Sequence, residues 1–396
     1  MKQSLLHIVG GGKGQLSLVK KAQSMGLSVL VTDMYADPPC KPLADKFLQI
    51  NTQDREGTLQ AAVRYGVDAV ATDQTDVAVS TVAYVAERLS LPGIGLETAL
   101  RFTNKRTMRE RLAAACPSNV PRFAGFTDKA ACCEYIAGCH GDVIIKPADS
   151  QGSRGVHRVA AEAQIEALVT DAFRGGFGGG VLVETFVQGD EVAVESVVVD
   201  DEPRLLAISA KEHYPENDAL DWRVSFPAAL TDRQRHLLVD LNRNIVRHMG
   251  LRNGLTHGEY KIDGEQVWII EIAARGAGSG VSSHIVPFLT GFDTGRAIID
   301  FAFGRRPALN IADNGTRVAV LEFLRANCGT ISKIEIARKA RDAAALLEIE
   351  LKLGDTVGRV HDSRDRAGYF IVCAENAADL DRKMETVRSG ITLESQ

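Results

Sequence analysis

Two glutamates stand in a stretch that reads as a β-hairpin. The run HGEYKIDGEQVWIIEIAAR places Glu259 in the first strand-like segment and Glu271 in the second, and it ends at Arg275. Asp263 and Gly264, between the two segments, are typical of a hairpin turn. Because Mg²⁺ prefers oxygen ligands and commonly bridges carboxylates to phosphate oxygens, the hairpin is a candidate site for phosphate chemistry.

The length of the turn decides whether the two acids can act together. A two-residue turn at 263–264 puts Glu259 and Glu271 on opposite faces, because side chains alternate along a strand. A loop with an odd number of residues centred on Glu265 makes them cross-strand partners, with Cα atoms about 5 Å apart. Two carboxylates that close repel by on the order of 3 kcal/mol at an effective dielectric of about 20, so a cation is expected between them. In the competing interpretation, Glu259 is a solvated strand residue and Glu271 pairs with Arg275 at the surface.

A second stretch, VIIKPADSQGSRGV, could hold phosphate groups. Lys146 ends its apolar run, and Gly152, Ser153 and Gly155 would let backbone N–H groups close over phosphate oxygens. The stretch is not a Walker P-loop, since the chain contains no G-x-x-x-x-G-K-[ST] pattern. An ordinary surface loop is the alternative. Lys105, at the start of a helical pattern, reads by itself as a solvated helix residue.

Strand and helix patterns alternate in the first quarter of the chain and predict a parallel, doubly wound sheet. The segments are 4–9, 28–33, 66–72 and 80–90. Gly10 and Gly12, with Asp33 at a strand end, partly match a dinucleotide-binding fingerprint. Gln15 occupies the third glycine position, which counts against the alternative of an NAD(P)-dependent oxidoreductase.

Helices and strands are mixed in the remainder of the chain. Glu184 and Glu191 flank a turn and read by themselves as exposed hairpin acids. We expect helices at 104–116, 232–249 and 376–388, and strands at 143–146, within 179–201, and near 317–323, 349–352 and 367–373.

The composition limits the class of protein. A chain of 396 residues, 45% of them hydrophobic, suggests two or three globular domains. The net charge of -5 argues against nucleic acid or an anionic membrane as a partner, and no apolar run is long enough to span a bilayer. The N-terminus enters a strand pattern without a cleavable signal, and the seven cysteines lack zinc-ligand spacing. We therefore expect reduced thiols in a cytoplasmic enzyme.

Four stretches follow one another along the chain: NK at 104–105, VIIKPADSQGSRGV, VLVETFVQGDEVAVE and the glutamate hairpin. In this order they resemble the ATP-grasp carboxylate–amine ligases, and the run RGAGSGVSSHIVPFLTGFD is similar to the L-amino acid ligases, which make dipeptides. The resemblance covers essentially the whole chain and implies an α/β fold. A Rossmann-like domain (1–103) would precede an ATP-grasp domain (104–305) that binds nucleotide and Mg²⁺ between its two subdomains. A small C-terminal α+β subdomain (306–396) would follow.

The resemblance also implies roles for the matching residues. The ATP-binding positions would be Lys105, Lys146, Gly152, Ser153, Gly155, Glu184, Thr185, Val187 and Glu191. Glu259 and Glu271 would bind two Mg²⁺ ions, with Mn²⁺ as the alternative metal, and Arg275 would face an acyl phosphate. The family motif at this point is commonly E-I-N-P-R, whereas Ala273 and Ala274 stand here, so the second ion loses a ligand.

The reaction implied by the resemblance joins a carboxylate, expected from an amino acid, to an amine. The carboxylate would attack the γ-phosphoryl group of ATP, and the amine would then displace phosphate from the acyl phosphate. His257 and His284 are candidate bases for the amine, whereas Lys211 reads as a solvated strand end in preference to a pocket residue. The alternative is a purine-biosynthesis-like ligase or transferase acting on a small metabolite. A homodimer with small-molecule substrates is the expected assembly.

Overall fold

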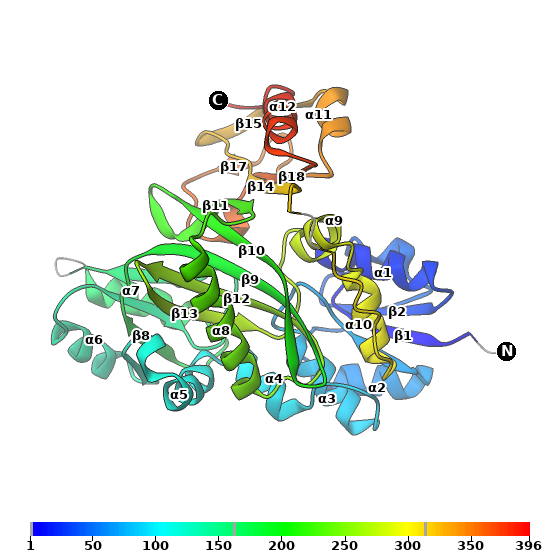
Figure 1. The fold of residues 1–396 in the computed structure, drawn as a ribbon, viewed down its shortest axis with the longest axis horizontal. Helices are drawn as coiled ribbons and strands as arrows, with labels where there is room; N and C mark the ends of the chain where they lie inside the picture. Colours follow the sequence, from blue (N-terminus) through cyan, green and yellow to red (C-terminus); the bar gives the residue numbers. More distant parts are fainter. Residues whose placement is uncertain (1–2, 161–163, 313–314) are drawn as a thin grey trace.

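The structure, a computed structural model, describes residues 3–160, 164–312 and 315–396 (Figure 1). Its N-terminal part is a parallel sheet of order β3-β2-β1-β4. The elements of this part are β1 (Leu5–Val9), α1 (Leu16–Ser24), β2 (Ser28–Asp33), β3 (Lys46–Gln49), α2 (Arg55–Tyr65), β4 (Ala69–Ala71), α3 (Val79–Arg88) and α4 (Leu96–Thr103).

Helices cover both faces of this sheet, as predicted. Leu6 and Ile8 of β1 pack against α1 and against α10 (Thr294–Ala302), whereas Leu5 and Val9 lie in a cluster with residues of α2 and α3. Because apolar side chains of β1 point alternately to the two faces of the sheet, both faces must be covered by helices. In the sequence, α10 lies far from the N-terminal strands. The N-terminal layer is therefore completed by a helix that we expected to belong to the ATP-grasp domain.

A smaller antiparallel sheet of order β5-β8-β6-β7 follows in the chain. Its strands carry the start of the stretch expected to hold phosphate and the start of the stretch that contains Glu184, and α6 and α7 pack on it. The elements are α5 (Lys105–Ala115), β5 (Phe123–Phe126), α6 (Lys129–Ala137), β6 (Val143–Pro147), β7 (His157–Val159), α7 (Ile165–Gly175) and β8 (Val181–Thr185).

The centre of the molecule is an antiparallel sheet of order β13-β12-β9-β10-β11-β14-β18-β16. Apart from the strand end expected at Lys211, the strands β10 and β11 were not predicted from the sequence, yet they form a long hairpin in the middle of the sheet. The elements are β9 (Asp190–Val199), β10 (Glu202–Tyr214), β11 (Asn217–Phe226), α8 (Asp232–Met249), β12 (Gly254–Asp263), β13 (Gln266–Ala273), α9 (Val286–Thr290), β14 (Val318–Phe323), β16 (Leu346–Ile349) and β18 (Gly368–Ala374).

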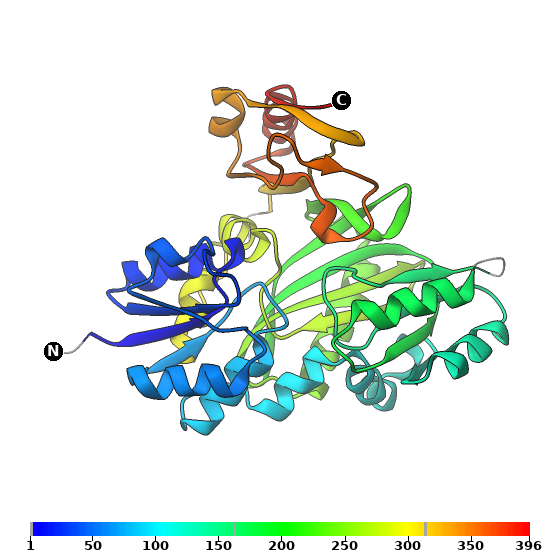
Figure 2. The same cartoon turned by 180° about the vertical axis from the view of Figure 1, so that it is seen from behind.

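The C-terminal part lies above the central sheet (Figure 2) and shares strands with it. Because β14, β18 and β16 extend that sheet, it continues across the limit expected at residue 306, and the predicted domain limits stay predictions. The strand expected near 349–352 lies at 346–349. The remaining elements are β15 (Gly329–Ile336), α11 (Arg338–Ala343), β17 (Thr356–Val357), α12 (Ala377–Arg388) and β19 (Ile391–Ser395).

The two faces of the central sheet differ in character. Val192 and Val194 of β9 and Tyr260 of β12 pack in the core with α8. Glu191 and Glu259, on the alternate positions of the same strands, point away from α8 and line a cavity. Strand periodicity therefore puts acidic side chains on the face opposite the core.

Two further expectations can be compared with the described residues. No helix among them combines the length and the apolar character needed to cross a bilayer. The seven cysteines of the chain all lie in this part, and none of them forms a disulfide.

Candidate active site

A cavity of about 300 Å³ lies between the central sheet, the smaller sheet and the N-terminal domain. Most of the site residues expected from the sequence line it: Lys105, Lys146, Gly152, Ser153, Glu184, Thr185, Val187, Glu191, His257, Glu259, Glu271 and Arg275. Gly155 packs instead against α7, and His284 bonds to the Ser283 hydroxyl, so neither of them reaches this cavity.

Glu259 and Glu271 are cross-strand partners in the β12–β13 pair. The turn comprises residues 264–265, so both predicted turn geometries are wrong. The pairing arises from a β-bulge at Ile270, where the register shifts by one residue. Val267 and Ile269 face the core before the bulge and Ile272 faces it afterwards, which turns Glu271 toward the cavity.

A lysine lies against each acid. Lys105 Nζ is 2.8 Å from Glu271 Oε1 and 2.7 Å from the carbonyl oxygen of Ser150. Lys211 forms an ion pair with Glu259 and lies 3.2 Å from Glu191 Oε1. The interpretation of Lys211 as a solvated strand end is wrong, because Lys211 lies within β10, which presents it to the cavity with its side chain 10% exposed.

Electrostatic interactions keep this group of side chains charged. Burial opposes the charge of Lys211, but Glu259 and Glu191 together raise its pKa. Burial also opposes the charge of Glu259, but Lys211 and His257 hold the pKa of its carboxyl well below the usual range. Glu259 is therefore a carboxylate, the form that can ligate a metal ion.

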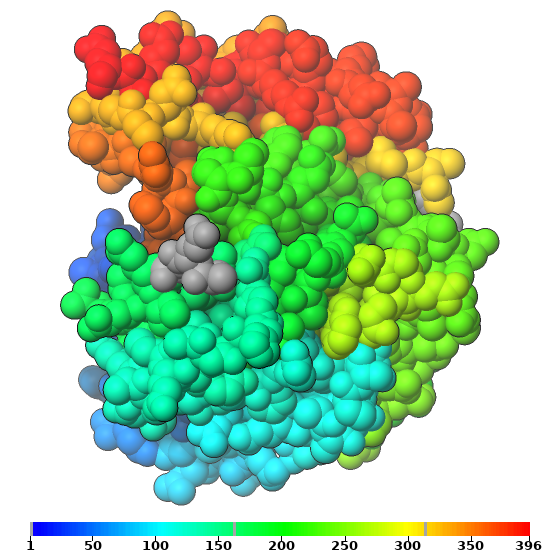
Figure 3. Space-filling view, turned by 90° about the vertical axis from the view of Figure 1, so that its left-hand side faces the viewer, coloured from blue at the N-terminus to red at the C-terminus, as the bar shows by residue number. Residues whose placement is uncertain are grey.

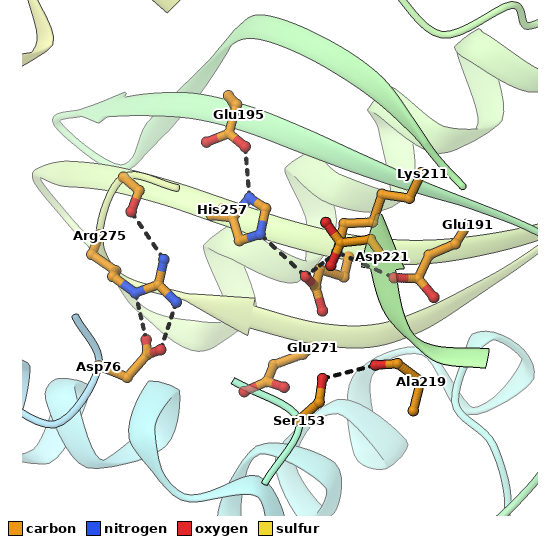
Figure 4. A network of polar contacts seen from close by, with 12 residues as sticks. Asp76, Ser153, Glu191, Glu195, Lys211, Ala219, Asp221, His257, Glu271 and Arg275 are labelled. Atoms are coloured by element: carbon orange, nitrogen blue, oxygen red, sulfur yellow. Dashed lines mark hydrogen bonds and ion pairs between the residues drawn. The ribbon is translucent and has the colours of Figure 1, made fainter. Parts of the chain in front are cut away.

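His257 lies between two carboxylates (Figure 4). Its Nδ1 is 2.6 Å from Glu195 Oε1 and its Nε2 is 3.3 Å from Glu259 Oε1. Burial disfavours the imidazolium, yet these acids raise the pKa of His257 to about 9. A raised pKa favours the imidazolium, which has no free nitrogen to accept a proton, so this arrangement does not support the role of base expected for His257.

Lys146 and Glu184 belong to a buried group that includes Arg109 of α5. Lys146 Nζ is 2.7 Å from Glu184 Oε2, and Arg109 Nε pairs with Glu184 Oε1. Burial would raise the pKa of Glu184, but Arg109 and Lys146 hold it below its ordinary value. Glu184 thus positions a lysine at the cavity wall, and both of its carboxylate oxygens already contact cations of the protein.

Thr185 and Val187, in the segment after Glu184, were expected to bind ATP. The Thr185 N–H donates to the Arg122 carbonyl at 2.9 Å and is therefore already used. The Val187 carbonyl accepts from Lys261 at 3.3 Å, and the Phe186 ring has Arg158 3.9 Å from its centroid. This segment therefore has fewer free polar groups to bind ATP than we expected.

The glycine- and serine-rich loop is held on two sides. Ser153 Oγ donates to the Ala219 carbonyl at 2.8 Å, and the Ser363 N–H donates to the Gly152 carbonyl at 3.3 Å. Figure 3 shows the C-terminal residues along the top of the face that carries the smaller sheet. The loop is therefore fixed by the β10–β11 hairpin and by the C-terminal part.

Arg275 reaches across to the N-terminal domain (Figure 4). Its Nε and Nη2 donate to the two carboxylate oxygens of Asp76 at 2.8 and 2.5 Å, and its Nη1 donates to the Gly276 carbonyl at 2.9 Å. The alternative in which Arg275 pairs with Glu271 at the surface is wrong. Asp76 follows β4 at the carboxyl end of the parallel sheet, where ligands commonly bind.

Sequence reasoning missed several residues of the site: Asp76, Arg109, Glu195 and Asp221. Arg109 had a usable signal, because it lies one helical turn after Lys105 on the same face of α5. Glu195 lies on the same side of β9 as Glu191, so strand alternation could have found it. Asp76 and Asp221 had no comparable signal.

The N-terminal glycine loop is closed by protein groups. Asp33 Oδ2 accepts from the Gly11 N–H at 2.7 Å, and Gln15 Nε2 donates to the Asp73 carbonyl at 2.6 Å. The acid that would bind a ribose in a dinucleotide site is thus used in the turn itself, which counts further against the oxidoreductase alternative.

Within the part of the chain that the structure describes, no group of three or more His, Cys, Asp or Glu side chains is arranged to hold a metal ion. The pair Glu259 and Glu271 nevertheless fits Mg²⁺, which is usually bound through one or two carboxylates together with substrate phosphates and water.

Two domain families match the chain. Residues 140–283 match the ATP-grasp domain, and residues 322–396 match the L-amino acid ligase C-terminal domain 2. The crystal structure of an L-amino acid ligase from Bacillus licheniformis superposes with a TM-score of 0.84, covering 100% of both chains at 21% sequence identity.

The relatives that are similar in sequence include proteins of two kinds. The uncharacterized protein y4rH of Sinorhizobium fredii is 29% identical over 76% of this chain, but the match spans only 63% of that relative. The formate-dependent phosphoribosylglycinamide formyltransferase of Parasynechococcus marenigrum is 24% identical over 86% of this chain and 87% of its own length. The chain therefore carries an ATP-grasp domain joined to an L-amino acid ligase C-terminal domain, on the fold of the ATP-grasp ligases.

Proposed function

We propose that the protein is an ATP-dependent carbon–nitrogen ligase that activates a carboxylate, expected from an amino acid, as an acyl phosphate and joins it to an amine. The observation that carries this proposal is one cavity that holds two lysines, two facing glutamates and an arginine: Lys105, Lys146, Glu259, Glu271 and Arg275. The L-amino acid ligase C-terminal domain supports the choice of an amino acid as the carboxylate.

The lysines supply positive charge for the phosphates of ATP. Lys105 and Lys146 lie on different elements, α5 and β6, and each is held by a carboxylate in the structure. The loop with Gly152 and Ser153 lines the same cavity and would close over the phosphates. Val187 and Glu191, which were also expected to bind ATP, line the same cavity.

Glu259 and Glu271 would hold the magnesium ion. When bound, the ion would neutralise charge on the phosphate oxygens during phosphoryl transfer. Ala273, in place of the commoner asparagine, lines the cavity without an oxygen donor, so water or substrate would complete the coordination of a second ion.

The chemistry follows in two steps. A carboxylate oxygen attacks the γ-phosphorus of ATP, its bond to phosphorus forms, and the bond to the β–γ bridging oxygen breaks to release ADP. The amine nitrogen then attacks the acyl carbon, the bond from that carbon to the phosphate oxygen breaks, and the nitrogen gives its proton to the departing phosphate. Arg275 would neutralise the acyl phosphate, and the closed loop would exclude the water that hydrolyses it.

A panel of carboxylates and amines tests the proposal. The protein is incubated with ATP and Mg²⁺ and with pairings of amino acids and simple amines, and both ADP release and product mass are measured. We expect ADP, phosphate and an amide in equal amounts. Release of AMP and pyrophosphate would show adenylation and overturn the acyl-phosphate route.

A second candidate is a ligase or transferase of the purine-biosynthesis type. The sequence similarity to the formate-dependent phosphoribosylglycinamide formyltransferase favours it. The same panel separates the two candidates when it includes formate as the carboxylate and phosphoribosylglycinamide as the amine. ADP release confined to that pair would favour the second candidate.

A further inference from the structure

The carboxylate of Asp76 is bound to Arg275, the arginine that would contact the acyl phosphate in the proposed reaction. It bonds through both oxygens to Arg275, at 2.8 and 2.5 Å, and Figure 4 shows the two side chains pointing at each other. The side chains are only 17% and 15% exposed, and both line the cavity of the site. The contact joins the N-terminal domain to the end of β13, next to Glu271.

This geometry is the one in which a guanidinium group binds a carboxylate substrate. A two-oxygen contact uses the Nε and Nη2 edge of the fork, and Nη1 donates to the Gly276 carbonyl at 2.9 Å. A substrate carboxylate that approaches Arg275 along the same edge must therefore displace Asp76. The carboxylate of Asp76 stands where the substrate carboxylate would stand.

Hydrogen bonds hold the main chain around Asp76 in place. The Asp76 N–H donates to Gln151 Oε1 at 3.0 Å, and Gln74 Oε1 accepts from the Gly280 N–H at 3.2 Å. These bonds attach the loop that contains Asp76 to the glycine- and serine-rich loop, which we call the flap, and to the segment after Arg275. A displaced Asp76 carboxylate consequently stays within the site.

A displaced Asp76 requires a new partner. A buried carboxylate without one is costly, and Lys105, a cation on the same cavity wall, is already bound to Glu271. A second carboxylate on Arg275 would also repel it. A positive group on the substrate, next to the substrate carboxylate, would give Asp76 a partner and would offset the repulsion between the two carboxylates.

We propose that Asp76 is a specificity-determining residue, which holds Arg275 until a substrate carboxylate replaces it and then binds an ammonium group adjacent to that carboxylate. The proposal rests on the function proposed above and names the recognised class: a carboxylate that bears a neighbouring ammonium group. A simple carboxylic acid leaves Asp76 unpaired and is discriminated against.

Matched substrates test the proposal. ADP release is measured with L-alanine against propanoate, and with L-leucine against 4-methylpentanoate, at a fixed amine concentration. The wild type should favour the amino acids by about 10- to 100-fold in kcat/KM, the value of one hydrogen-bonded charge pair. Asp76→Asn should remove that preference, raising KM for the amino acids while leaving or lowering KM for the simple acids.

The control variant is Glu202→Gln. Glu202 also makes a two-oxygen contact with an arginine, Arg247, but on the surface and away from the cavity. It should leave the preference unchanged. An equal loss of activity with both kinds of acid in Asp76→Asn, or an unchanged preference, would overturn the assignment and leave Asp76 a structural residue.

A binding measurement separates this proposal from the proposed function. Calorimetric titration of L-leucine and 4-methylpentanoate into wild type and Asp76→Asn needs no turnover. Absence of ADP release with the whole panel would overturn the ligase function. Equal binding of both ligands by the wild type would overturn the role of Asp76, whatever the activity.

Discussion

Glu259 and Glu271 face each other across the β12–β13 pair because β13 has one extra residue, Ile270, at that point. The carbonyl oxygen of this bulged residue accepts a hydrogen bond from Arg109 Nη2, and Arg109 also pairs with Glu184. The bulge, the buried ion group and the candidate metal ligands are therefore one connected structure. Such bulges commonly re-aim side chains next to active sites.

Glu271→Gln should abolish ADP formation while the fold remains. The neutral amide binds Mg²⁺ more weakly than the carboxylate does, and a loss of roughly 100-fold or more in kcat is expected. Glu265→Gln, in the exposed turn of the same hairpin, is the matched control and should keep full activity. Full turnover by Glu271→Gln with an unchanged melting temperature would contradict the metal assignment.

Glu184→Gln should destabilise the protein by about 3–5 kcal/mol, because it leaves the buried charges of Arg109 and Lys146 without their carboxylate. Urea unfolding measures this difference. Glu110→Gln removes an exposed ion pair with Arg106 on the same helix, and should change stability by less than about 1 kcal/mol. A similar loss of unfolding free energy in the two variants would show that the buried group of Arg109, Lys146 and Glu184 does not act as a unit.

Gly152→Ala should slow ADP formation by roughly 10- to 100-fold. Gly152 has a φ of +67°, and a Cβ atom there would collide with Ser363 Oγ, so the flap would move off its C-terminal contact. Gly264→Ala shares the positive φ, at +59°, but meets open space, and it should cost only about 1 kcal/mol of stability. Adding Ser363→Ala to Gly152→Ala should restore part of the rate; no recovery would exclude this contact as the cause.

Stability should fall in mild acid because of His7. Burial lowers the pKa of His7 to about 3, so below its unfolded value of 6.5 the unfolded chain binds a proton that the folded protein excludes. The stabilising effect is complete above pH 6.5 and is lost as the pH falls toward 3, by about 1.4 kcal/mol per pH unit.

The comparison that isolates this effect uses His7→Gln. Urea unfolding at pH 7 and pH 5 should show the wild type losing about 2 kcal/mol more than the variant. The exposed His140→Gln should behave like the wild type. Equal pH dependence in all three proteins would refute a neutral, buried His7.

The sequence by itself determined the alternating N-terminal layer, the long helix at 232–249 and the predicted site residues that line the cavity, such as Lys146 and Glu259. These depend on local information, namely hydrophobic periodicity, turn residues and motif order, which a single chain records directly. Lys105, Lys146, Glu259 and Glu271 could be named for this reason.

The tertiary structure decided which side chains meet. The bulge at Ile270, the two strands that carry Lys211 and Asp221, and the contact between Asp76 and Arg275 all depend on segments far apart in the chain. Register, burial and charge pairing across such distances are set by packing, because the same residue types also occur as ordinary solvated side chains. The position of His257 between two carboxylates was likewise decided by the tertiary structure, because only the folded sheet brings Glu195 and Glu259 beside it.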